Sequence, residues 1–348
     1  RLSSINDGVK GHQFQDNVMV PVSEEKIITD EDAPLALSDL KRWVSKGTYT
    51  WLEKADQEAE VLKQELDDTA AASSANLFGD DDEDEVRVHK WSTSLLNPDG
   101  ATGLDAAEDG AVSIVYLLSS SLAGFGDIVW SSSRHISNLL ANPETCRTVL
   151  SHYFSTEESN HSIKHPLSGV SFLELGAGAG VPSWSAMGCG ARVVCTDQPN
   201  SDRIRCIAEC VERNFRNMTK QTPTNAIYDK CQACPYGWGT KIDEVTKALN
   251  KSGDERFDVI VAADCMYMPW LHTELLDSID LLLSDRGVAL MPFALHGNTD
   301  DGDVLRIIDR AKEKGFEVDE LAEAQLTPPS EGMALKQGLV KTVRLTRK

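Results

Sequence analysis

The sequence has no apolar run of about 18 residues, whereas a helix that crosses a membrane needs roughly 20. Positive charge is also scarce, because 34 Lys and Arg stand against 55 Asp and Glu, for a net charge of −21. Direct binding to a phosphate backbone rests on neutralisation by Lys and Arg, so this balance disfavours it. We therefore predict a cytoplasmic protein without a membrane or direct nucleic-acid partner, and expect a neutral or basic partner instead.

The eight cysteines are scattered along the chain and lack the spacing of a disulfide scaffold. Cys231 and Cys234 form one C-x-x-C pair. A structural zinc site would need two more ligands, for which Cys206 and Cys210 are the nearby candidates, and it stays an alternative. We predict reduced thiols and no metal.

An acidic run, Asp80–Glu85, divides the chain. Such a run repels itself and cannot bury surface, so it predicts a solvated linker over 76–90, or a docking tail for a basic protein. Before it, residues 39–66 carry apolar side chains at helical spacing. We therefore expect an N-terminal helical and disordered extension over 1–75.

A glycine turn carries most of the functional information. Phe172–Leu175 is a short apolar run that leads into Gly176-x-Gly178-x-Gly180 and then into the start of a helix. Glycine supplies positive φ and lets a ligand lie against the backbone. The spacing differs from the dinucleotide fingerprint, and Glu174 would repel a pyrophosphate, whereas a cationic cofactor tolerates this acid.

A carboxylate follows at the end of the next apolar run. Residues 191–197 predict a second strand that ends in Asp197. An acid at this distance from a glycine turn can accept hydrogen bonds from both hydroxyls of a ribose. The turn and the acid together predict a cradle for a nucleoside-type cofactor.

Four further segments extend the pattern in order. They are Gly126-Asp127-Ile128-Val129-Trp130, Thr196-Asp197-Gln198-Pro199-Asn200, Tyr236-Gly237-Trp238-Gly239 and Ala263-Asp264-Cys265-Met266-Tyr267 with His272. With these residues the chain resembles the class I S-adenosylmethionine-dependent methyltransferases. Within them it is similar to the protein lysine and protein N-terminal methyltransferases formerly described as nicotinamide N-methyltransferase-like. The resemblance covers residues 110–348, which we expect to form the methyltransferase domain.

The resemblance implies S-adenosylmethionine as the cofactor and a set of residues that contact it. It implies Trp130, Gly176, Ala177, Gly178, Asp197, Trp238 and Ala263, to which the turn itself adds Glu174 and Gly180. One departure is Met268-Pro269, where the group often has Asn-His.

The fold class that follows is α/β, a doubly wound, seven-stranded, Rossmann-like sheet with an antiparallel C-terminal strand. The apolar patterns predict strands at 111–118, 170–175, 257–263 and 287–295, and helices at 133–140, 201–215, 272–283 and 303–315. The last two predicted strands, 316–324 and 338–346, have no crossover helix between them and should pair antiparallel.

The chemistry would be methylation of an amine, which must first lose a proton. A slot lined by Tyr267, Trp270 and Phe293 would favour the neutral amine through desolvation, and Asp264 could orient it. We take Asp264, Tyr267 and His296 as the catalytic candidates. We favour His296 over His272, since a hydrogen bond to the backbone is the simpler role for His272.

The leading hypothesis is an S-adenosylmethionine-dependent methyltransferase acting on a lysine side chain, an N-terminal amine, or both, of a basic protein. The resemblance makes elongation factor 1-alpha the first substrate to test. Two alternatives are methylation of a small, nicotinamide-like nitrogen heterocycle, and a degenerate fold used as an interaction module through residues 1–90. An enzyme should keep cofactor binding when residues 1–90 are removed.

Overall fold

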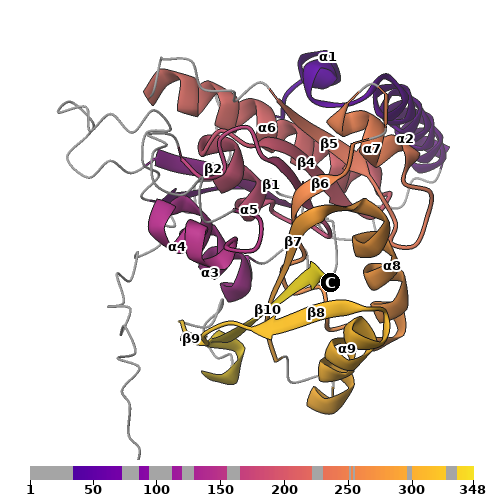
Figure 1. Cartoon of the computed structure of the whole chain (residues 1–348). Helices are drawn as coiled ribbons and strands as arrows, with labels where there is room; N and C mark the ends of the chain where they lie inside the picture. Colours follow the sequence, from indigo (N-terminus) through magenta and orange to yellow (C-terminus); the bar gives the residue numbers. More distant parts are fainter. Residues whose placement is uncertain are drawn as a thin grey trace, which may run out of the picture.

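The structure is a computed structural model of the whole chain (Figure 1). It describes residues 34–72, 86–93, 112–119, 129–154, 165–221, 230–250, 252–253, 255–295, 300–326 and 335–348.

A mixed sheet forms the centre of the molecule, with strand order β5-β4-β3-β6-β7-β10-β8 (Figure 1). The first five strands of this path are parallel, and β10 is antiparallel to both β7 and β8. A short strand, β9, also pairs with β10. In chain order the strands are β3 (Ser171–Glu174), β4 (Arg192–Asp197), β5 (Cys231–Pro235), β6 (Phe257–Val261), β7 (Leu283–Ala294), β8 (Phe316–Glu320), β9 (Ala324–Gln325) and β10 (Leu339–Arg347).

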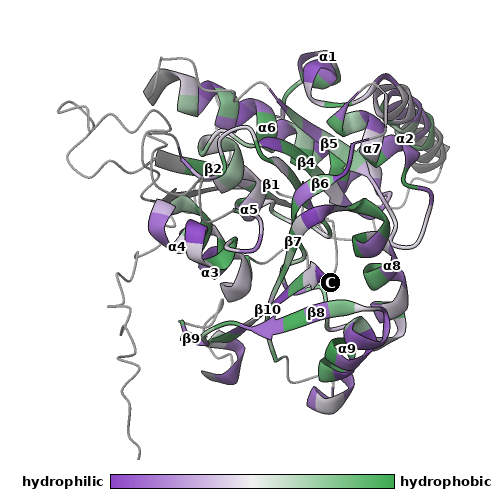
Figure 2. Ribbon diagram, viewed as in Figure 1, coloured by the Kyte–Doolittle hydropathy of each residue, from purple (hydrophilic) through white to green (hydrophobic). Residues whose placement is uncertain are grey.

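Helices cover both faces of this sheet, and the buried apolar residues form two clusters. Ile136, Trp184 and Ile204, from α3, α5 and α6, belong to one buried cluster. Val245 and Leu275, from α7 and α8, belong to the other, together with residues of α9. Figure 2 shows hydrophobic colour along the central strands and hydrophilic colour on the outer turns of α9. The helices are α3 (Ser131–Ala141), α4 (Pro143–Val149), α5 (Val181–Gly188), α6 (Ser201–Gln221), α7 (Asp243–Leu249), α8 (His272–Leu282) and α9 (Asp301–Glu313), with the 3-10 helices η5 (Pro269–Leu271) and η6 (Leu335–Gly338).

The predicted doubly wound sheet of seven strands is confirmed, including the antiparallel pairing of the last two long strands. Leu345 of β10 pairs with Val318 of β8 in an antiparallel register. The chain returns from β8 by inserting β10 between β8 and β7. Each helix and strand range expected from the apolar patterns corresponds to an observed element within a few residues, whereas β1, β5, α4 and α7 were not predicted.

A separate two-stranded sheet precedes the main one. Strands β1 (Val86–Thr93) and β2 (Val112–Ser119) pair antiparallel. The predicted linker over 76–90 is wrong at its end, because residues 86–90 lie in β1. The acidic run itself, Asp80–Glu85, lies outside the described residues. Strand β2 packs on α6, and the Leu117 N–H donates a hydrogen bond to Cys210 Sγ at 3.2 Å.

The segment before the acidic run packs into the core of the sheet domain. It consists of α1 (Leu37–Leu40), η2 (Lys41–Trp43) and α2 (Lys46–Ala72). Trp43 is fully buried, its ring centroid lies 5.0 Å from that of Phe215 on α6, and its indole N–H donates to Glu212. Val44 forms a parallel bridge with Ala233, which covers the outer edge of β5.

Polar contacts hold this segment along α6 as well. The Leu35 N–H donates to Glu209 at 3.2 Å, and Arg205 pairs with Asp56 at 2.7 Å. The Arg42 guanidinium lies over the rings of Trp43 and Phe215, at 4.5 and 4.4 Å from their centroids. Residues 35–56 therefore contact the sheet domain at several points.

None of the helices that the structure describes combines the length and the apolar character needed to cross a membrane.

We predict that Trp43→Ala lowers the free energy of unfolding by about 3–5 kcal/mol, since it leaves a cavity the size of an indole between η2 and α6. Urea denaturation at neutral pH measures this change.

The matched control is Trp270→Ala, which removes an indole that is 72% exposed. It should change the free energy of unfolding by no more than about 0.5 kcal/mol. Equal stability of Trp43→Ala and the wild type would contradict the packing described for residues 35–56.

Candidate functional site

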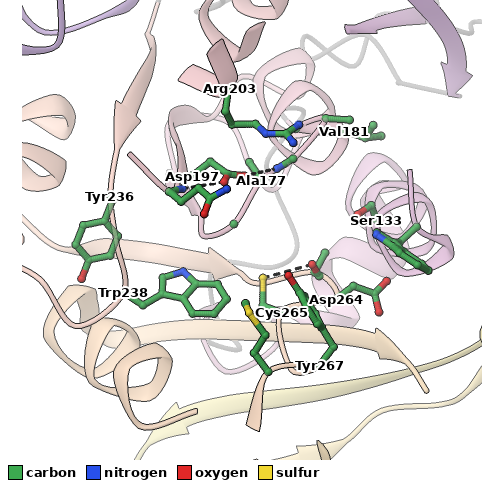
Figure 3. Close-up of a pocket in the computed structure, with 18 of the residues that line it drawn as sticks. Ser133, Ala177, Val181, Asp197, Arg203, Tyr236, Trp238, Asp264, Cys265 and Tyr267 are labelled. Atoms are coloured by element: carbon green, nitrogen blue, oxygen red, sulfur yellow. Dashed lines mark hydrogen bonds between the residues drawn. The ribbon is translucent and has the colours of Figure 1, made fainter. Parts of the chain in front are cut away.

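A cavity of about 690 Å³ lies at the carboxyl ends of β3, β4 and β6 (Figure 3). Parallel sheets of this kind bind ligands there. The cavity wall includes eight of the nine cofactor residues expected from the sequence, namely Trp130, Gly176, Ala177, Gly178, Gly180, Asp197, Trp238 and Ala263.

The glycine turn has the conformation that its sequence indicates. Gly176, Gly178 and Gly180 have φ of 64°, 53° and 69°. A Cβ on Gly176 would lie 2.8 Å from Cys265 Sγ and 3.1 Å from the ring of Trp238. A Cβ on Gly180 would lie 2.5 Å from the ring of Trp184. The turn can therefore be built only with glycine at these two positions.

Asp197 lies at the end of β4, opposite the turn. Its carboxylate accepts hydrogen bonds from the N–H groups of Gly178, at 2.7 Å, and Gln198, at 2.8 Å. Burial raises the pKa of Asp197, and these two N–H groups and the Arg203 guanidinium oppose that rise. Each carboxylate oxygen can accept a further hydrogen bond, so Asp197 is suited to bind a pair of hydroxyl groups.

Glu174 is not on the cavity wall, so its expected contact with a cofactor is not supported by its position. The side chain is buried and accepts hydrogen bonds from the backbone N–H of Ser183, at 2.9 Å, and from the Ser183 hydroxyl, at 2.5 Å. Burial raises its pKa to about 8, against the effect of these two donors. Glu174 thus holds the first turn of α5 and favours the neutral form near pH 7.

Asp264 lines the opposite side of the cavity and is the only non-glycine residue with positive φ, 50°, among those described. One carboxylate oxygen accepts from the Ser132 hydroxyl of α3, and the other accepts from the Ala294 N–H at 2.9 Å. Asp264 therefore joins the loop after β6 to α3 and to the end of β7. These contacts give Asp264 a structural role, and its catalytic role stays a prediction.

Tyr267 also lines the cavity, on the same side as Asp264 (Figure 3). Burial is the main cause that raises its pKa to about 12, with nearby acidic groups adding to it. The phenol therefore stays protonated near neutral pH and cannot act as a general base there. His296 lies outside the described residues and stays a prediction.

The expected slot of Tyr267, Trp270 and Phe293 is wrong. Only Tyr267 faces the cavity, since Phe293 is buried in the core below α8 and α9 and Trp270 is exposed. His272 is buried, and its ring contacts the Met266 carbonyl at 2.8 Å, so the expected hydrogen bond to the backbone is confirmed.

Several residues of the cavity wall were given no role by the sequence reasoning. Ser133 and Arg203 were not singled out, and Asn200 and Tyr236 appeared only within the quoted segments. The Asn200 side chain accepts from the Arg203 N–H at 2.9 Å and so caps α6, and this N-cap pattern is readable in the sequence. Ser278 of α8 holds the loop around Trp238 by contacts of 2.9 Å with the Tyr236 hydroxyl and the Gly239 N–H, which no local pattern indicates.

The C-x-x-C pair lies inside β5. Cys231 belongs to the core cluster on one face of the sheet and Cys234 to the cluster on the other. Because side chains three residues apart in a strand point to opposite faces, these two thiols cannot bind one ion.

A family model described as lysine methyltransferase matches residues 117–303. Curated relatives include a protein N-terminal and lysine N-methyltransferase of Gibberella zeae, 33% identical over 167 residues, which are 46% of this chain and 62% of that protein. The protein of the same description from Schizosaccharomyces pombe is 28% identical over 177 residues, 49% of this chain and 66% of that protein. The chain thus spans less than two thirds of the length of these relatives.

Solved structures give more distant likenesses. One is magnesium protoporphyrin IX methyltransferase from Synechocystis with bound S-adenosylmethionine, at 12% identity and a TM-score of 0.36, covering 65% of this chain and 85% of that chain. The family assignment rests on the family model.

We predict that Gly176→Ala lowers the free energy of unfolding by about 1–3 kcal/mol, because alanine is strained at this φ and its Cβ would press on Cys265 and Trp238. Thermal and urea denaturation measure the loss.

Gly237→Ala is the matched control on the same cavity wall. A Cβ there would meet Thr240 at 3.4 Å, an ordinary contact, and we expect the free energy of unfolding to stay within about 0.5 kcal/mol of the wild type. Equal losses in the two variants would show that the conformation of Gly176 is not the cause.

We predict that Glu174→Gln removes a dependence of stability on pH. Folding raises the pKa of Glu174 from 4.5 to about 8. The stabilising contribution of the neutral side chain is therefore fully present below pH 4.5 and is lost as the pH rises through about 8. Between these values the wild type should lose stability relative to the variant by at most about 1.4 kcal/mol per pH unit.

Urea denaturation of both proteins at pH 5, 6.5 and 8 tests this. Parallel dependences of stability on pH in the wild type and Glu174→Gln would mean that Glu174 is ionised in the folded protein.

Proposed function

This chain belongs to the lysine methyltransferase family, and we propose that it is an S-adenosylmethionine-dependent methyltransferase of protein amines. The acceptor is a lysine side chain, an N-terminal amine, or both, on a basic protein. One observation carries this proposal. A single cavity joins the glycine turn and Asp197 on one side to Asp264 and Tyr267 on the other.

The family match bears out S-adenosylmethionine as the cofactor, and the residues of the cavity fit it. The backbone of Gly176, Ala177 and Gly178 lines the cavity, and the absence of side chains on the two glycines lets a ligand lie against it. Asp197 would hold the ribose hydroxyls, and the side chains of Trp130 and Trp238 supply apolar walls. When bound, this cofactor supplies a sulfonium methyl group whose transfer leaves a neutral thioether.

The residues opposite Asp197 would hold the acceptor amine. A lysine ammonium has no free lone pair, so it must lose a proton to solvent before it can react. The half-buried wall around Tyr267 favours the neutral amine, and the protonated phenol can donate a hydrogen bond but cannot remove the proton near neutral pH. Alignment and desolvation can supply most of the catalysis, without a covalent intermediate.

The fungal relatives are described as protein N-terminal and lysine N-methyltransferases, which supports a protein acceptor for this chain. The resemblance noted in the sequence makes elongation factor 1-alpha the first substrate to test. Its basic character would suit a chain with a net charge of −21.

Methylation of a small heterocycle is the second candidate function. A short apolar segment beside the cavity argues against it, because this segment favours a larger acceptor. Met268 and Leu271 line the cavity while Trp270 between them is exposed. A non-enzymatic interaction module would gain support only from a failure to bind the cofactor.

We predict that S-adenosylhomocysteine binds the wild type with micromolar affinity and that Asp197→Ala weakens this affinity by about 10- to 100-fold. The reason is that hydrogen bonds to a charged group are worth about 1.5–3 kcal/mol. Isothermal titration calorimetry measures both dissociation constants without knowledge of the acceptor.

Asp285→Ala, which removes an exposed carboxylate from β7, is the matched control and should bind like the wild type. Transfer of a radioactive methyl group to purified, unmethylated elongation factor 1-alpha is then measured with the same three proteins. No binding of S-adenosylhomocysteine to the wild type would reject the cofactor site. Binding without methylation of elongation factor 1-alpha, or of any protein in a methyl-depleted lysate, would reject the protein acceptor.

A further inference from the structure

Four consecutive apolar residues lie at the mouth of the cavity, in the run Met268-Pro269-Trp270-Leu271, which we call the rim segment. Met268, Pro269 and Leu271 are half-buried, whereas Trp270 is 72% exposed. It is the one tryptophan among the large hydrophobic side chains that are exposed in the described part of the chain. A run of apolar residues at the surface is costly unless it has a function.

The backbone of the rim segment is held in place by hydrogen bonds from both sides. The Leu271 N–H donates to the Met268 carbonyl at 2.9 Å, and the Arg310 guanidinium of α9 donates to the Pro269 carbonyl at 3.2 Å. The buried His272 ring donates through Nε2 to the Met266 carbonyl at 2.8 Å. Arg310 and His272 thus fix the chain on either side of an indole that points to solvent.

A fixed backbone lowers the entropy that is lost when a partner binds, and exposed tryptophans are common among the residues that dominate binding energy. The position of Trp270 beside the cavity indicates which kind of partner it would contact. Met268 and Leu271 line the cavity, so the exposed Trp270 between them is placed to contact a polypeptide whose amine enters the cavity. A small heterocycle would be held within the cavity and would not need this contact.

We propose that the rim segment is the docking surface for the acceptor protein, and that a basic stretch next to the methylated amine lies across Trp270. This inference rests on the proposed function. A Lys or Arg side chain packs its aliphatic stem and its charge on an indole face, and the net charge of −21 favours a basic partner. The same net charge disfavours a second copy of this chain as the occupant.

The test compares Trp270→Ala with Trp270→Phe and with Leu281→Ala, which removes another exposed hydrophobic side chain, 50% exposed, from α8. Initial rates of methyl transfer are measured with purified, unmethylated elongation factor 1-alpha at varied concentration and saturating S-adenosylmethionine. Calorimetry with S-adenosylhomocysteine is run on every variant.

We expect Trp270→Ala to raise KM for the protein at least tenfold, while kcat and the affinity for S-adenosylhomocysteine stay within twofold of the wild type. Trp270→Phe should recover most of the loss, and Leu281→Ala should match the wild type.

An unchanged KM in Trp270→Ala, with an active wild type, would overturn the docking surface and leave the proposed function standing. Weaker binding of S-adenosylhomocysteine by Trp270→Ala would overturn it too, because Trp270 would then support the cofactor cavity. A wild type that binds S-adenosylhomocysteine but methylates neither elongation factor 1-alpha nor any protein in a methyl-depleted lysate would overturn the protein acceptor and the docking surface together.

Discussion

The turn between β3 and α5 is the constraint on which the site depends. Three residues of this turn have positive φ, and Cys265 and Trp238 occupy the space into which a side chain at Gly176 would extend. The turn is tied to the next strand, since the Ala177 N–H donates to the Thr196 carbonyl at 2.9 Å and the Gly178 N–H donates to Asp197 at 2.7 Å. The same contacts that shape the backbone therefore also position the carboxylate that faces it, so the cradle and Asp197 form one unit.

The sequence predicted this unit because each part has a local pattern. The apolar run before Gly176 and the one before Asp197 show the period and length of buried strands, and glycine is the residue that a left-handed turn requires. For Glu174 the sequence indicates an acid at the end of the strand before the turn, but not the side of the sheet on which its carboxylate lies. The carboxylate accepts hydrogen bonds from the Ser183 hydroxyl and N–H and is not on the cavity wall, so its contact with a cofactor stays a prediction that its position does not support.

The acceptor side was less predictable because it depends on contacts between distant segments. Asp264 and Tyr267 were identified by resemblance, and both line the cavity. The position of Asp264 depends on the Ser132 hydroxyl and the Ala294 N–H, which are 132 and 30 residues away in the chain. Phe293, expected from the sequence to line the slot, lies near the end of β7. In a strand its side chain must point to one face, and here that is the core face below α8 and α9.

The N-terminal segment changes what a deletion experiment would mean. Residues 35–56 contact α6 through Trp43, Glu209 and the Arg205–Asp56 pair. The first turn of the same helix, capped by Asn200, carries Arg203 into the cavity beside Asp197. Removal of residues 1–90 would therefore uncover the edge of β5. It would also empty the pocket that Trp43 fills against α6, the helix that reaches the cavity. Loss of cofactor binding in such a truncation follows from this packing alone, so it cannot distinguish an enzyme from an interaction module. A substitution that leaves α6 covered, such as one in the rim segment, separates partner binding from the integrity of the fold.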